Sequence, residues 1–172
     1  MKFEGGCYCR KIRYVADGEP RLKAQCHCRE CRYITGGAPN MFMLVAPQGF
    51  RYTSGEPRKF SRSDLESPVT REFCGECGTH LATRRPGLRL IILKIGTLDD
   101  PSLFGAPQMA IYTVDKQPFH VLPESLQTFE RLARAGPKKR GGSRQTLLCH
   151  DTANPDPTAR SSRDESPAAL LA

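Results

Sequence analysis

The sequence predicts a mainly β domain built from small antiparallel sheets, with one short helix near its C-terminal end. Short segments rich in β-branched and aromatic residues, separated by turn signals, are typical of such a fold. Seven of the eight cysteines also lie in three groups within the first 77 residues. A length of 172 residues with 38% hydrophobic content is enough for one domain with a core and too short for two ordinary ones.

Six segments have the composition of strands, because β-branched and aromatic residues favour extended backbone. They are residues 11–15, 41–45, 50–53, 69–73, 88–95 and 109–114. Turn signals separate them at Asp17-Gly18, Gly36-Gly37, 54–57 and 99–101. The pattern of short strands and tight turns favours an all-β arrangement.

A single helix is expected at residues 123–136, where Leu126, Phe129 and Leu132 recur on one face and Gly136 can end the helix. We expect this helix to close the domain, which we place at residues 1–135. Residues 136–172 are rich in Pro, Ser, Ala and Arg, and such a composition cannot bury enough apolar surface to offset the entropy of ordering. They are predicted to form a disordered tail in which Cys149 is a free thiol.

The N-terminal residues MKFEGG lack the apolar run of a signal peptide, and no stretch approaches the ~18 apolar residues of a membrane span. We therefore expect a cytoplasmic protein with no membrane partner. Cysteines in a reducing compartment seldom form disulfides, and they serve metal binding or thiol chemistry instead.

The formal charge of +8 raises the question of nucleic-acid binding. Residues 1–135 hold 20 basic and 14 acidic side chains, and two zinc ions bound by seven thiolates would lower their charge by three. The arginines are scattered and lack the interleaved aromatic residues of a single-strand binder. A solvated surface is thus a better interpretation than a nucleic-acid partner.

The cysteine groups have spacings suited to metal chelation. They are Cys7 and Cys9, then Cys26, Cys28 and Cys31, and finally Cys74 and Cys77. On a strand, the first pair would direct both sulfurs to one face. The last pair precedes Gly78, as in a zinc-knuckle turn. Zinc is the expected metal for thiolate ligands, although the spacing alone leaves iron–sulfur ligation open.

Two tetrahedral sites need eight protein ligands, one more than these groups supply. The simplest partition joins Cys7, Cys9, Cys74 and Cys77 in a closed structural site, because they occur in pairs. It leaves Cys26, Cys28 and Cys31 with an open fourth position, which distinguishes a catalytic zinc from a structural one. Three histidines are the alternative fourth ligands. We expect a hydrogen-bonding or surface role for His27 instead, and we expect His80 and His120 to be hydrogen-bonded structural residues.

Four segments of the sequence resemble the glutathione-dependent formaldehyde-activating enzyme family, whose domain is shared with centromere protein V. The segments are GGCYCRKIRY, CHCRECR followed by GGAP, REFCGECGTHL, and IYTVDKQPFHVLPESLQTFE. The resemblance covers about residues 3–132. It implies a β-tent fold, a structural zinc at the first and third cysteine groups, and a catalytic zinc at the middle group.

The resemblance also implies an activity. Members of the family are carbon–sulfur lyases that condense glutathione with formaldehyde to S-hydroxymethylglutathione, and the reverse, with two zinc ions per chain. Glutathione brings carboxylates, for which Arg29, Arg32, Lys59 and Arg62 are the candidate partners. A zinc-containing binding module of the same fold, without aldehyde chemistry, is the alternative. The open metal position favours the enzyme, whereas the basic excess and the tail favour the module.

Overall fold

The computed structural model describes residues 1–132. The predicted tail at 136–172, with Cys149, lies outside the described residues, and so does the domain boundary at residue 135. Both stay predictions. No helix in the described part of the chain is long and apolar enough to cross a membrane.

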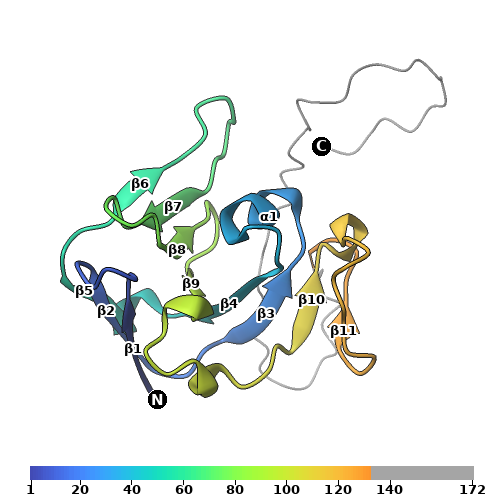
Figure 1. Cartoon of the computed structure of the whole chain (residues 1–172), viewed down its shortest axis with the longest axis horizontal. Coiled ribbons are helices and arrows are strands. Elements are labelled where there is room, and N and C mark those ends of the chain that lie inside the picture. The colour runs from blue at the N-terminus through green and yellow to red at the C-terminus, as the bar shows by residue number, and fades with distance from the viewer. Residues whose placement is uncertain (133–172) are drawn as a thin grey trace.

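The described residues form two sheets, which confirms the mainly β class. The smaller sheet has three antiparallel strands in the order β1-β2-β5. Their bounds are β1 Lys2–Gly6, β2 Arg13–Asp17 and β5 Phe50–Ser54. Figure 1 shows this sheet beside the N-terminus.

The larger sheet has eight strands in the order β11-β10-β3-β4-β9-β8-β7-β6. In chain order its strands are β3 Leu22–Cys26, β4 Asn40–Val45, β6 Arg58–Phe60, β7 Thr70–Phe73, β8 His80–Arg84, β9 Ile91–Lys94, β10 Met109–Ile111 and β11 Gln127–Thr128. All pairs are antiparallel except β10 with β3 and with β11, which are parallel. Four 3-10 turns connect strands: η1 Pro47–Gly49, η2 Ile95–Thr97, η3 Pro101–Phe104 and η4 Thr113–Asp115.

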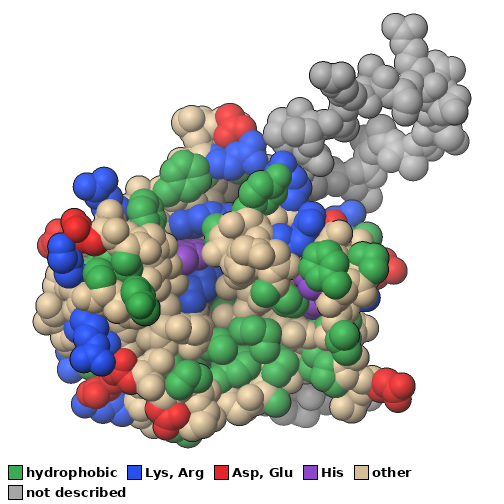
Figure 2. Space-filling view, viewed as in Figure 1, with side chains coloured by type: hydrophobic (Ala, Val, Ile, Leu, Met, Phe, Trp, Pro, Cys, Tyr) green, Lys and Arg blue, Asp and Glu red, His purple; other side chains and the backbone are tan. Residues whose placement is uncertain are grey.

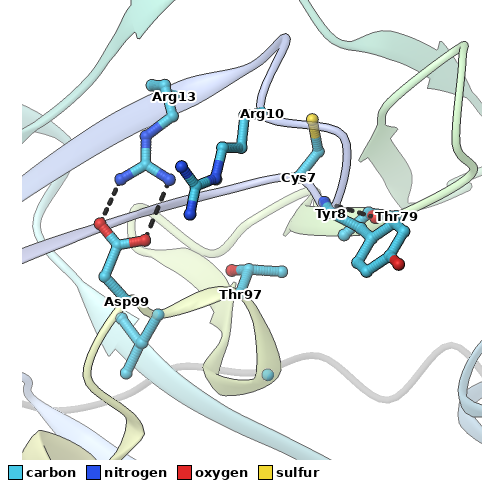
Figure 3. Close-up of a pocket in the computed structure, with 10 residues that line it drawn as sticks. Cys7, Tyr8, Arg10, Arg13, Thr79, Thr97 and Asp99 are labelled. Carbon is cyan, nitrogen blue, oxygen red and sulfur yellow. Dashed lines mark hydrogen bonds and ion pairs between the residues drawn. The ribbon is translucent and has the colours of Figure 1, made fainter.

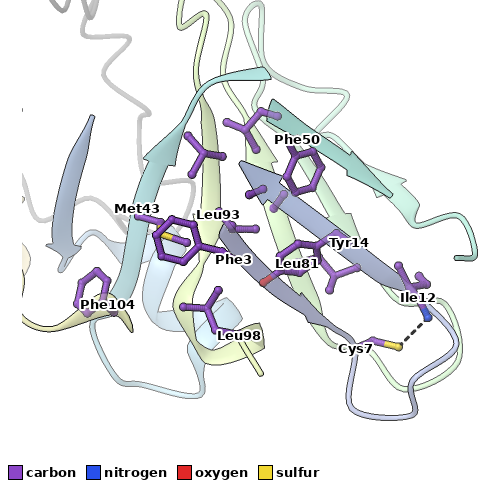
Figure 4. Packing of buried hydrophobic residues seen from close by; sticks show 14 of the residues in the cluster. Phe3, Cys7, Ile12, Tyr14, Met43, Phe50, Leu81, Leu93, Leu98 and Phe104 are labelled. Atoms are coloured by element: carbon purple, nitrogen blue, oxygen red, sulfur yellow. Dashed lines mark hydrogen bonds between the residues drawn. The ribbon is translucent and has the colours of Figure 1, made fainter. Parts of the chain in front are cut away.

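The main core lies where the smaller sheet packs on one face of the larger sheet (Figure 4). Phe3 and Tyr14 of the smaller sheet meet Met43, Leu81 and Leu93 of the larger one, and all five are almost completely buried. The apolar surface that they remove from water is the chief stabilising contribution of this interface.

A second core cluster occupies the opposite face of the larger sheet. It contains Ala24, Phe42 and Ile111, with the cysteines of the middle group packed against it or within it. The helix α1, Arg29–Thr35, lies over this face and contacts β4. Each cysteine cluster is therefore associated with a different face of the sheet.

The C-terminal helix expected at 123–136 is wrong for the residues that the structure describes. Residues 127–128 form β11 instead, and the backbone N–H of Phe129 donates to the carbonyl of Ala110 at 2.9 Å. Phe129 and Leu132 do pack against the second core cluster, but from a mostly extended segment. Apolar residues at helical spacing are partly buried here by a segment that pairs along the sheet edge, so tertiary contacts outweighed the local preference.

The one α-helix of residues 1–132 lies instead in the first half of the chain, at α1. None of its seven residues is buried, so it lacks the apolar stripe that predicts a helix from sequence. Gly36 ends it in the left-handed conformation, with φ of 69°, and the N–H of Gly37 donates to the carbonyl of Arg32 at 2.8 Å. The turn expected at Gly36-Gly37 is thus the C-cap of this helix.

Candidate metal centres

Four cysteines from two distant loops form one compact cluster. Cys7 and Cys9 follow β1, while Cys74 and Cys77 lie between β7 and β8, and all four sulfur atoms are within 4.8 Å of one another. The Sγ atoms of Cys7 and Cys9 are 3.4 Å apart, and those of Cys9 and Cys74 are 3.7 Å apart. Sulfurs at the corners of a zinc tetrahedron are separated by roughly 3.8 Å, given Zn–S bonds of ~2.3 Å. The cluster therefore fits a zinc ion closely.

The first pair reaches this position by a turn, and the expected strand geometry is wrong. Arg10 has a φ of 63°, and its N–H donates to the carbonyl of Cys7 at 2.9 Å. The N–H of Ile12 donates to the Cys7 sulfur at 3.2 Å. Cys74 and Cys77 occupy a similar turn, in which Gly78 has the left-handed φ of 73° and donates to the Cys74 carbonyl. Both chelating loops are knuckle-like turns that direct sulfur inward.

Thr79 joins the two knuckle turns. Its hydroxyl oxygen accepts from the N–H of Tyr8 at 3.1 Å and lies 3.2 Å from the Cys77 sulfur. The contact with the Thr79 side chain is the main cause that lowers the pKa of the Cys77 thiol to about 5. A thiol with a lowered pKa is more readily present as the thiolate that a metal requires.

We predict that Thr79→Val lowers the affinity of the four-cysteine cluster for metal by about tenfold or more, the usual effect of losing a group that orients a ligand. Thr79→Ser, which keeps the hydroxyl, is the matched control. Competition with a chromogenic chelator measures both affinities. Equal affinities in the Val and Ser variants would contradict the role assigned to the hydroxyl.

Cys26, Cys28 and Cys31 form a second cluster, with their sulfurs within 4.8 Å of one another. Cys26 ends β3 and is buried, Cys28 is the N-cap residue of α1, and Cys31 lies in the first turn of that helix. Cys28 and Cys31 are half-buried. The three thiols converge because the chain passes directly from the strand to the helix. No His, Asp or Glu in residues 1–132 joins this group.

His27 is hydrogen-bonded away from the cysteines that flank it, as expected. Its Nδ1 atom is 3.1 Å from Nδ1 of His120, and the side chain is fully buried. His120 Nε2 donates to the carbonyl of Gly37 at 2.7 Å, so its Nδ1 accepts the proton of His27. This pair connects the end of β3 with Gly37, the residue after the C-cap of α1, and so joins the two ends of the segment that contains the three cysteines.

His80 also has hydrogen-bond partners, again as expected. Its Nε2 is 3.0 Å from the carbonyl of Ala82 and 3.1 Å from the hydroxyl of Thr83. Burial, reinforced by the positive charges of Lys94 and Arg71, lowers its pKa to about 3. His80 is therefore neutral at physiological pH.

Two cavities open near these clusters without being lined by the middle cysteines. One, of about 290 Å³, lies beside Cys7 and is bordered by Arg10 and by the Arg13–Asp99 ion pair (Figure 3). The other, of about 440 Å³, lies between residues 36–39 and 119–121. The loop that ends α1 forms one wall of this second cavity, and the segment with His120 and exposed Phe119 forms another.

The basic residues expected to bind a substrate carboxylate lie in different parts of the structure. Arg29 and Arg32 lie on α1 with the cysteines, and the Arg29 guanidinium stacks over the ring of Tyr33 at 5.0 Å. Arg62 is hydrogen-bonded to Asp64, and Lys59 is an exposed residue of β6. Two other cations, Lys94 of β9 and Arg71 of β7, interact electrostatically with Cys31. Sequence reasoning missed both, although a lysine that ends the apolar run LRLIILK was a visible signal.

Within residues 1–132, two sheets, one short helix and two cysteine clusters that could each hold a metal ion define a mainly β protein with two candidate metal sites. The sequence model of the glutathione-dependent formaldehyde-activating enzyme family matches residues 2–115. The match spans more than half of the chain, which therefore belongs to this family.

Two further comparisons add little to this assignment. A structural-genomics crystal structure of a Rhodobacter sphaeroides protein is similar, with a TM-score of 0.46 and 16% sequence identity. The alignment covers 60% of this chain and 96% of that one. None of the curated proteins matches the chain.

Proposed function

We propose that the protein is a zinc-dependent carbon–sulfur lyase. Its reaction joins glutathione, or a similar small thiol, to formaldehyde or another aldehyde, and it also runs in reverse. The observation that carries this proposal is the cluster of three thiols at Cys26, Cys28 and Cys31, which is one ligand short of a closed tetrahedron. Membership of the family supports the choice of thiol and aldehyde substrates.

The donor set of each cluster fits zinc, because soft thiolates at these separations are its preferred ligands. Cys7, Cys9, Cys74 and Cys77 would complete a structural site. Zinc held by the middle group would supply an exchangeable fourth position and stabilise a substrate sulfur as thiolate. The chain's own residues position that group: β3 presents Cys26, and α1 presents Cys28 and Cys31.

The proposed reaction needs only these reactants. The thiolate sulfur attacks the carbonyl carbon of the aldehyde, a carbon–sulfur bond forms, and the π electron pair of the carbonyl moves to oxygen. The proton released from the thiol returns to that oxygen through solvent, which gives the S-hydroxymethyl adduct. Deprotonation of the thiol and proximity of the two reactants account for the acceleration. We place this chemistry in the cytoplasm, where thiols stay reduced.

Thiol binding and aldehyde exchange test the proposal with the same protein. In the cobalt-substituted protein, glutathione should change the thiolate charge-transfer absorption, whereas S-methylglutathione, whose sulfur is blocked, should not. Exchange spectroscopy should then show faster interconversion of glutathione and its hydroxymethyl adduct than the uncatalysed rate.

A zinc-containing binding module is the second candidate, favoured by the formal charge of +8. Thiol binding without acceleration would support the module over the enzyme. If neither thiol binding nor acceleration is found with glutathione or other small thiols, the lyase assignment fails.

A further inference from the structure

Two cations lie on the face of the sheet that carries the middle cysteine group. Lys94 is opposite Phe42 of β4, and Phe42 is opposite Ala24, two residues before Cys26. Because paired residues share a face and alternate residues on a strand do too, Lys94 and Cys26 are on the same face.

The same register places Arg71 on that face. Ile92, two residues before Lys94, pairs with Thr83 of β8, and Thr83 pairs with Arg71 of β7. Figure 1 shows β7 and β8 next to α1. In Figure 2 a hollow between these elements contains a histidine side chain with Lys or Arg side chains around it.

Neither cation has an acidic partner within residues 1–132. The ion pairs of this part of the chain involve other basic groups, and only one of its acidic residues, Glu72, is fully buried. Glu72 is committed to Arg84 and Tyr52, at 2.7 and 2.8 Å. Lys94 is nevertheless only 7% exposed. A buried ammonium is costly unless a negative group compensates its charge.

The cysteines supply part of that compensation. Lys94 and Arg71 both interact electrostatically with Cys31, whose side chain packs against the core cluster on the same face of the sheet. A divalent metal held by three thiolates has one net negative charge, which would repel an anionic substrate. The two cations reverse that sign and leave one net positive charge in the hollow.

We propose that Lys94 and Arg71 form an anion site beside the three-cysteine cluster that recognises a carboxylate of the thiol substrate. The inference rests on the proposed function and narrows its substrate class to carboxylate-bearing thiols. Arg71 offers a planar fork of donors that suits a carboxylate, and Lys94 adds a charge whose hydration is already lost. These are specificity residues, distinct from the arginines of α1 that the sequence suggested.

Three small thiols of similar size provide the probes: 3-mercaptopropionate, 2-mercaptoethanol and cysteamine, which differ in the charge of the group beyond the sulfur. Their affinities for the cobalt-substituted full-length protein are read from the charge-transfer absorption and compared per mole of thiolate. We expect the anionic thiol to bind about tenfold more tightly than the neutral one, and the cationic thiol to bind most weakly.

Lys94→Met and Arg71→Met should each reduce the preference for the anionic thiol to about threefold or less, with little change for the neutral thiol. Methionine keeps most of the unbranched apolar stem of both side chains and removes the charge, and the metal content and circular dichroism of each variant verify the fold. Arg51→Met, in the smaller sheet and paired with Asp17, is the control and should retain the full preference.

The outcomes separate this proposal from the proposed function. Equal binding of all three thiols by the unaltered protein would overturn the anion site while leaving the lyase intact. A preference that survives in both variants would overturn the assignment to Lys94 and Arg71. If no thiol binds at all, the proposed function fails first. If Lys94→Met loses its metal, the test rests on Arg71→Met. A reduced preference for the anionic thiol in that variant supports the anion site, and an unchanged preference means that the cations only compensate the charge of the cysteines.

Discussion

Cys74→Ala is expected to unfold the domain as well as remove one metal ion. Cys74 is 1% exposed and belongs to the main core, and its cluster links the turn after β1 to the turn between β7 and β8. Structural zinc in small domains contributes about 10–16 kcal/mol of apparent binding free energy, which is comparable to the ~5–15 kcal/mol that stabilises a typical domain. Losing this site should therefore eliminate cooperative folding.

Circular dichroism, thermal unfolding and a zinc count on the purified protein measure this effect. Chelation of the unaltered protein should produce the same unfolded spectrum, because it removes the same ion. Replacement of Cys149, which lies outside the three cysteine groups of the sequence, is the control and should leave both the spectrum and the zinc content unchanged. A folded Cys74→Ala variant would show that packing alone maintains the fold and that the four-cysteine cluster is not its support.

The strands that sequence patterns identified were those that cross a core. Residues 41–45 and 50–53 correspond to β4, whose side chains are all buried or half-buried, and to β5, in which Phe50 is buried and Tyr52 is half-buried. By contrast, β3 reads LKAQC, without a β-branched or aromatic residue, and β6 reads RKF, which is only three residues long and exposed. Their strand conformation comes from pairing with neighbours already in the sheet, which a local pattern does not record. The same reason accounts for the missed β8.

Cysteine chemistry was more predictable than secondary structure. Ligand counting from sequence gave a group of four and a group of three, and the structure brings together sulfurs in the same two groups. Counting succeeds because a tetrahedral ion imposes a number that is independent of the backbone conformation. Backbone details did not follow: Cys7 and Cys9 occupy a turn, and Cys31 lies in a helix. To predict that Arg71 and Lys94 lie near the middle group, the strand register must be known, because both residues are far from that group in sequence.

Cys31→Ser is expected to remove the catalytic acceleration and to leave the fold intact. Cys31 projects from α1, a helix of seven residues with no buried member, and its cluster closes only the short segment from Cys26 to Cys31. Loss of its sulfur therefore opens only a short loop and should change the free energy of unfolding little. The four-cysteine cluster, by contrast, joins segments more than 60 residues apart. The zinc count should fall from two towards one.

The expected rate effect is larger than the stability effect. Loss of an orienting group outside the ligand sphere typically costs about 10–100-fold, so loss of a ligand should reduce the rate at least 100-fold, roughly to the uncatalysed exchange. Exchange spectroscopy between glutathione and its hydroxymethyl adduct measures the rate, and thermal unfolding measures the fold. An active Cys31→Ser variant would move the reaction away from this cluster. A collapsed one, indistinguishable from Cys74→Ala, would mean that both clusters are structural. Only an inactive variant with a retained fold agrees with the assignment in which the three-cysteine cluster binds the substrate and the four-cysteine cluster stabilises the fold.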